Sequence, residues 1–174
     1  RIDLWHNSNS MRGTLPARYR RGATLDEITD DIGGGYHKIV PEFLKVRSPE
    51  DNIDRGIGVY RLWGMAYRPE LVGVDREVKK EGDTTLVTYH TPLGSVSCRV
   101  LYSEEMKQAG VSFPWITEHV IKEPKNYKTV GYIFENAKVL PDYENYLEFH
   151  KKVGDKGIAV AFGNVAGSPM HHIM

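Results

Sequence analysis

VGVDREVKKEGDTTLVTYHTPLGSVSCRVLY, residues 72–102, carries the most regular pattern of the chain. Apolar side chains recur there at every second position, most clearly at Val96, Cys98 and Val100, with polar residues between them. A period of two is typical of strands with one buried face. Turn residues separate the apolar runs, at 81–83 and at 91–94. The pattern predicts an antiparallel β-meander with one face in water.

On both sides of residues 72–102, short apolar runs alternate with amphipathic segments, which is the pattern of α/β proteins. Before this stretch we expect a strand over 2–6, a polar loop over 7–22, a helix from Thr24 and a strand over 38–40. Thr24 and Glu27 have the spacing of a capping box, and the glycines at 33–35 end the helix.

After the meander we expect two further helices and a last strand. Proline is favoured at the start of a helix, so we expect these helices to begin at Pro124 and Pro141. Residues 158–162 are apolar throughout, which is typical of a parallel strand buried on both faces. The side chains expected to face inward are Tyr127, Val130 and Phe134 on the first helix, and Tyr143, Tyr146, Leu147 and Val153 on the second.

Composition excludes several classes of protein. The 174 residues hold 23 Lys and Arg against 23 Asp and Glu, so the basic surplus typical of a nucleic-acid binder is absent. No apolar run is long enough for a transmembrane helix, which predicts no membrane contact. One cysteine and no signal peptide favour a cytoplasmic protein. Both ends lie in or beside predicted structure, so we expect a piece of a longer protein.

Candidate binding residues follow three predicted strands, where α/β proteins place their ligands. Glu42 follows the second strand and is a candidate acid or base, or else a surface carboxylate. His171, one of two adjacent histidines after the last strand, is a further and weaker candidate; adjacent histidines on a helix point about 100° apart, so both rarely bind one metal. The loop after the first strand offers an imidazole, two amides and a guanidinium to a polar substrate, unless it is only solvated: His6, Asn7, Asn9 and Arg12.

Four segments give the chain a resemblance to a known superfamily. Leu15 to Arg20 (LPARYR) and Gly167 to Met170 (GSPM) resemble segments of the uroporphyrinogen decarboxylases. Residues 89–94 (YHTPLG) and 116–127 (ITEHVIKEPKNY) resemble instead the corrinoid-dependent methyltransferase branch of that superfamily. The resemblance implies the N-terminal part of a TIM-type (β/α)₈ barrel, an α/β fold that is incomplete here because a whole barrel needs about 250 residues. Residues 1–174 would then be one partial domain, with 72–102 as an inserted meander.

The resemblance also implies what the chain does and what it lacks. The decarboxylases hold substrate carboxylates with two arginines, at the positions that Asn9 and Gly13 occupy here, which argues against porphyrinogen decarboxylation. The methyltransferases use zinc, held by histidine and cysteine ligands in a later part of the family's chain. The chain itself would therefore bind no cofactor, and zinc and a corrinoid would belong to the full-length family member.

We therefore expect part of an enzyme that moves a methyl group between a small methylated substrate and a corrinoid protein or a thiol, inactive alone. A half barrel leaves sheet edges open, so either a homodimer or the missing C-terminal half is expected to cover them. Two alternatives stay open: a decarboxylase for another acid, and a non-catalytic binding or assembly domain. We expect Cys98 to be a small core residue and not a nucleophile.

Overall fold

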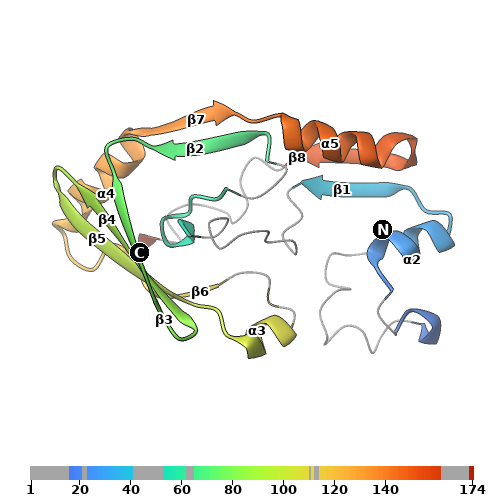
Figure 1. The fold of residues 1–174 in the computed structure, drawn as a ribbon, viewed down its shortest axis with the longest axis horizontal. Coiled ribbons are helices and arrows are strands. Elements are labelled where there is room, and N and C mark those ends of the chain that lie inside the picture. The colour runs from blue at the N-terminus through green and yellow to red at the C-terminus, as the bar shows by residue number, and fades with distance from the viewer. Residues whose placement is uncertain are drawn as a thin grey trace.

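The computed structural model describes residues 16–20, 23–40, 53–61, 65–109, 111, 114–161 and 173–174. In these ranges eight strands form three separate sheets (Figure 1). No helix there is both long and apolar enough to cross a membrane.

The largest sheet has four antiparallel strands in the order β3-β4-β5-β6. Its first three strands are the meander: β3 (Asp75–Glu81), β4 (Thr84–Thr91) and β5 (Gly94–Leu101). Gly82, with φ 61°, occupies the first turn in the left-handed conformation that suits glycine. After helix α3 (Glu104–Gln108), strand β6 (Trp115–Glu118) adds to β5, with a register irregularity between Arg99 and Val100. The predicted antiparallel meander is confirmed.

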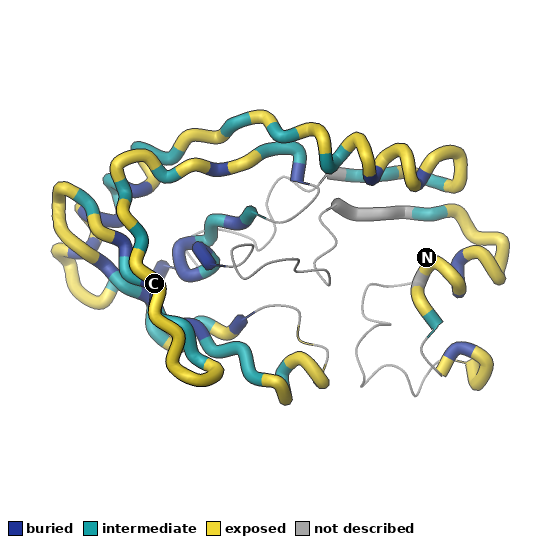
Figure 2. Tube along the Cα trace, viewed as in Figure 1, coloured by how far each residue is buried: buried dark blue, intermediate teal, exposed yellow. Residues whose placement is uncertain are grey.

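The core lies against the inner face of this sheet. Val87 and Tyr89 of β4 and Cys98 of β5 are fully buried there, as Figure 2 shows by the dark segments on this side of the molecule. They pack against the short 3-10 helix η4 (Arg55–Ile57) and against helix α4 (Asn126–Glu135). In β4 and β5 the alternation seen in the sequence therefore separates buried side chains from those nearer to solvent.

The other two sheets each have two strands. Strands β2 (Tyr67–Leu71) and β7 (Ala137–Pro141) pair antiparallel. Strands β1 (Tyr36–Val40) and β8 (Gly157–Ala161) pair parallel, and helix α5 (Glu144–Val153) packs on them through Phe149 and Val153. The short 3-10 helix η5 (Gly154–Lys156) links α5 to β8.

Near the N-terminus, the 3-10 helix η2 (Ala17–Tyr19) is followed by helix α2 (Leu25–Asp31). The capping box is confirmed: Glu27 N donates to Thr24 Oγ1 at 3.2 Å, and Thr24 N donates to Glu27 Oε2 at 2.6 Å. Gly33, at φ 64°, follows the end of this helix as expected.

The prediction of part of a (β/α)₈ barrel is wrong. A barrel is built from parallel strands joined by helices. Here β1 and β8 form the one parallel pair among the described strands, whereas the other two sheets are antiparallel and separate from it. The described residues are instead mixed α/β with mostly antiparallel strands, because β2, β6 and β7, for which no strand was predicted, pair antiparallel.

Three predictions of burial are also wrong. Tyr127 and Phe134 of α4 are exposed, and the helix buries Val130 and Ile133 together with Asn126 and Thr129. Pro141 ends β7 and does not open α5; of the side chains expected to face inward, Val153 is buried, whereas Leu147 and Tyr143, which precedes the helix, are exposed. Strand β8 is parallel as predicted, yet Ile158 is 65% exposed, so the strand is not buried on both faces.

Candidate functional site

The most highly connected polar group of the described chain is a carboxylate beneath the meander sheet. Asp54 precedes η4 and is 1% exposed. Its Oδ2 accepts from Arg76 Nη1 of β3 at 2.6 Å and lies 3.4 Å from Arg61 Nη2. Its Oδ1 accepts from the Tyr89 hydroxyl of β4 at 3.1 Å. We call Asp54, Arg61, Arg76 and Tyr89 the Asp54 cluster.

Strand register brings this cluster together. Arg76 and Tyr89 are direct partners across β3 and β4, so both side chains project from the same inner face of the sheet. The loop that carries Asp54 is held beside them by a second arginine. Arg55 Nε donates to the Pro114 carbonyl oxygen at 2.6 Å, and Arg55 Nη1 donates to the Tyr60 hydroxyl at 2.8 Å.

Cys98 of β5 lies next to the cluster, close to Gly56 and Asp54. A Cβ on Gly56 of η4 would lie 2.1 Å from Cys98 Sγ, so glycine alone permits this approach of loop and sheet. Burial chiefly, with the charge of Asp54 second, raises the pKa of the Cys98 thiol to about 12. Cys98 is therefore a protonated core side chain, as predicted, and not a nucleophile.

Tyr89 is protonated for the same reasons. Burial first, and then the charge of Asp54, raises the pKa of the Tyr89 hydroxyl well above its ordinary value. The hydroxyl is thus a fixed donor to Asp54. Neither Tyr89 nor Cys98 supplies a base at neutral pH.

The chemistry open to the Asp54 cluster is ionic recognition. One aspartate and two arginines give a formal charge of +1, and the guanidinium groups are partly exposed, 31% at Arg61 and 23% at Arg76. The Arg61 Nε–H is buried and has no hydrogen-bond partner among the described residues. Because Asp54 already engages both guanidinium groups, the cluster joins η4 to the sheet and does not offer several free cations to a polyacid.

The predicted site residues lie outside the ranges that the structure describes. This holds for all six: His6, Asn7, Asn9, Arg12, Glu42 and His171. The predicted strand over 2–6 and the segment 167–170 lie outside as well. These expectations therefore remain predictions.

The zinc implied by the resemblance does not fit the residues that the structure describes. No three His, Cys, Asp or Glu side chains gather as a metal site in the described part of the chain. Zinc binds the thiolate form of cysteine, whereas Cys98 is fully buried with its pKa near 12. We therefore derive no step through zinc.

Two segments that carry the resemblance to the methyltransferases are in contact. The β4–β5 turn at 91–94 lies against α4, which begins at the end of segment 116–127. Thr129 Oγ1 of α4 donates to the Leu93 carbonyl oxygen at 3.3 Å, and a Cβ on Gly94 would lie 3.4 Å from the same hydroxyl. Asn126 Oδ1 accepts from the backbone N–H groups of Lys122 and Glu123 at 2.9 and 3.0 Å, which shapes the entry to α4.

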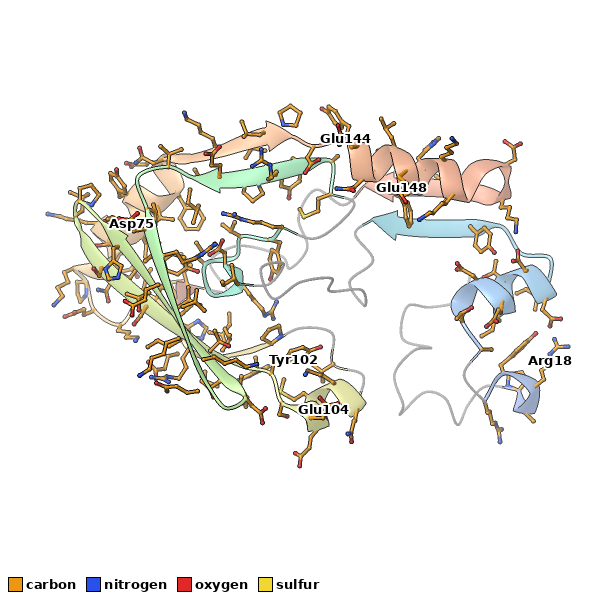
Figure 3. All side chains as sticks on the ribbon, viewed as in Figure 1. Arg18, Asp75, Tyr102, Glu104, Glu144 and Glu148 are labelled. Atoms are coloured by element: carbon orange, nitrogen blue, oxygen red, sulfur yellow. The ribbon has the colours of Figure 1, made fainter. Side chains whose placement is uncertain are left out.

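The segment 15–20 is tied to α2. Arg18 Nη2 lies 3.0 Å from Asp31 Oδ2, and the Tyr19 hydroxyl donates to the same oxygen. The Arg18 guanidinium also lies over the Tyr19 ring, 4.6 Å from its centre; Figure 3 labels Arg18 on this short helix. The guanidinium of Arg18 is therefore already paired.

Sequence reasoning did not find the Asp54 cluster, although one signal was present. In the sequence Arg76 lies between Val74 and Val78, where a period of two would place an apolar residue; in the structure Arg76 is partly buried, whereas Val78 is 44% exposed. A charged residue at an inward position needs a buried partner, because an unpaired buried charge is strongly unfavourable. The pattern could have indicated an acidic partner, but not which one.

We compared the chain with family models, with curated proteins and with solved structures, and none of the three comparisons found a match.

Proposed function

We propose that this chain is part of an enzyme that transfers a methyl group between a small methylated substrate and a corrinoid protein or a thiol. The proposal rests on the residues that resemble the methyltransferase branch. The strand order rules out, for the described residues, the barrel that the resemblance also implied, so the proposal rests on these segments alone.

The contact between the β4–β5 turn and α4 is the observation that supports this proposal. The first segment contains Leu93, whose carbonyl oxygen accepts from Thr129, two residues beyond the second segment on α4. The turn is closed by its own side chain, because Thr91 Oγ1 donates to the Gly94 carbonyl oxygen at 2.9 Å and accepts from Leu93 N at 3.1 Å. The turn and the start of α4 therefore lie side by side.

This surface suits contact with an apolar partner. Leu93 at the turn and Tyr127 on α4 are both more than half exposed, although both are large hydrophobic side chains. A corrinoid bound to its carrier protein presents methyl groups at the ring edge, between amide side chains. We assign the surface to docking of that corrinoid.

The described residues bind and position; they do not supply the methyl acceptor. A methyl group that leaves a corrinoid is taken up by an ionised thiol, and the Cys98 thiol is buried and protonated. We therefore expect binding without turnover in the chain alone.

The test is a titration of the chain with hydroxocobalamin, followed by visible absorbance and equilibrium dialysis. We expect saturable binding that Leu93→Asp weakens at least about tenfold, a loss of about 1.4 kcal/mol. The matched control is Ile32→Asp, which places the same charge on a comparably exposed residue after α2. Absence of saturable binding, or equal loss in both variants, contradicts the proposal.

The alternative of a decarboxylase for another acid gains no support from the described arginines. It needs unpaired cations for the substrate carboxylates, but Arg18 pairs with Asp31 and the arginines of the Asp54 cluster share Asp54. Arg12 lies outside the described ranges.

The alternative of a binding or assembly domain is favoured by one observation. Large apolar side chains of β7 and α5 are exposed, among them Val139 and Leu147. If the chain binds no corrinoid but self-associates, the assembly function holds and the methyltransferase proposal fails.

A further inference from the structure

Exposed apolar side chains follow one another from β7 into α5. Val139, Tyr143 and Leu147 are 67%, 57% and 60% exposed, and they occur at intervals of four residues. Figure 2 shows the outer side of both elements as largely exposed, and Figure 1 shows that the two elements run end to end along one side of the molecule. Contiguous exposed apolar residues mark interaction surfaces more often than scattered ones.

Charged side chains frame Leu147 on α5. Glu144 lies three residues before it and Lys151 four residues after it, so all three lie on one face of the helix. Glu144 and Lys151 are exposed, and neither side chain has an ion-pair partner among the described residues. Figure 3 labels Glu144 near the start of the helix and Glu148 one turn further on. Glu148 differs from Glu144 because it pairs with Lys152 at 2.9 Å within the helix.

This arrangement is complementary to itself. In a twofold dimer, each residue of one copy faces a fixed residue of the other, and the reciprocal contact also forms. If two α5 helices pack antiparallel with the twofold axis between positions 147 and 148, Glu144 of each copy faces Lys151 of the other. Two ion pairs then flank the two Leu147 side chains, which bury one another.

We propose that α5 is the interface of a homodimer, formed by antiparallel packing of two copies through Leu147 with reciprocal Glu144–Lys151 ion pairs. Tyr143 and Val139 extend the apolar contact towards β7. A helix of ten residues is about 15 Å long, so the interface is small and the dimer is weak. The inference is independent of the methyl-transfer proposal, because it concerns residues outside the turn and α4.

The experiment is sedimentation velocity of the whole chain from about 5 to about 500 µM at low salt, a range suited to a weak dimer. We expect a reversible monomer–dimer equilibrium that shifts towards monomer at high salt. Glu144→Lys and Lys151→Glu each turn two attractions into repulsions. We expect each to raise the dimer dissociation constant about tenfold or more.

A mixture of the two single variants gives the decisive result. In the mixed dimer, Lys at 144 of one variant faces Glu at 151 of the other, and the two unchanged residues face each other as Glu and Lys. Both ion pairs are then restored. We therefore expect the mixture to dimerise about as well as the unmodified chain, and the double variant Glu144→Lys with Lys151→Glu to do the same.

Restored dimerisation in the mixture and in the double variant shows that the single variants act at the interface and not by destabilising α5. Each single reversal is unfavourable to the α5 dipole, so the double variant would be the least stable helix and would associate least if only the helix mattered. A monomer at every concentration, a dimer that neither reversal weakens, or weakened singles without restoration in the mixture would each overturn the proposal. Leu147→Lys, with Ile32→Lys as the control, checks the apolar contact independently.

Discussion

Replacement of Asp54 by asparagine tests whether the Asp54 cluster holds the loop before η4 to the meander sheet. The substitution keeps the shape of the side chain and removes its charge. It leaves Arg76 Nη1, which lies 2.6 Å from Oδ2, and Arg61 Nη2, at 3.4 Å, without a carboxylate. The Tyr89 hydroxyl, 3.1 Å from Oδ1, keeps an amide oxygen to which it can donate.

The size of the effect follows from burial. Removal of one partner from a fully buried ion pair costs about 3–5 kcal/mol. Asp54 is 1% exposed, but the two arginine side chains are 23% and 31% exposed, so water recovers part of their solvation. We therefore expect a loss of about 2–3 kcal/mol in the free energy of unfolding. For a chain of this size that lowers the Tm by about 4–12 °C.

The assay is urea unfolding at pH 7, followed by tryptophan fluorescence and circular dichroism. Tyr89→Phe removes only the hydroxyl donor and should cost less than Asp54→Asn. Asp155→Asn, an exposed carboxylate on η5, is the matched control and should stay within about 0.5 kcal/mol of the unmodified chain. A loss below about 0.5 kcal/mol for Asp54→Asn would refute the reasoning that the buried carboxylate organises this region.

Three further predictions follow from the geometry. Gly56→Ala should lower the urea midpoint strongly, because its Cβ would lie 2.1 Å from Cys98 Sγ, and combining it with Cys98→Ala should cost less than the sum of the two. The pKa of Cys98 is raised to about 12 in the folded chain, so its thiol stabilises the fold at pH values below its unfolded pKa. Urea titrations should show that this contribution to the free energy of unfolding is lost as the pH rises from about 9 towards 12. The loss of stability over this pH range should be smaller in Cys98→Ala. The backbone N–H of Thr24 first, and its hydroxyl second, lower the pKa of Glu27; Thr24→Ala removes only the hydroxyl and should raise that pKa part of the way back in an NMR titration. The stability that this pKa shift contributes is lost as the pH falls through the folded value.

Local features of the fold could be predicted from the sequence. The capping box at Thr24 and Glu27 involves atoms three residues apart, so the sequence contains the whole interaction. The same is true of the tight turn at Gly82 and of the alternation in β5, where the burial of Val96, Cys98 and Val100 matches the prediction.

Pairing between distant segments could not be predicted. Strand β2 contains Pro69, which lacks an N–H donor and argues against a strand, yet β2 pairs with β7 about 70 residues later. Residues 137–141 contain a proline that resembles a helix start, but they form that partner strand. Helix α5 then begins at Glu144 and buries Phe149 and Val153, whereas Leu147, which was expected to face inward, is exposed, because the side that packs is set by contacts with β1 and β8.

In the candidate site, too, local features could be predicted from the sequence and contacts between distant segments could not. The sequence by itself determined that Cys98 lies on an apolar strand face, since this follows from a period of two residues. Only the tertiary structure decided that Asp54, 22 residues before Arg76 and 35 before Tyr89, lies between them. It also decided that β1 and β8 pair alone and not within a barrel. The physical reason is that strand alternation and helix caps depend on neighbouring residues, whereas sheet order and buried ion pairs depend on which distant segments exclude water together.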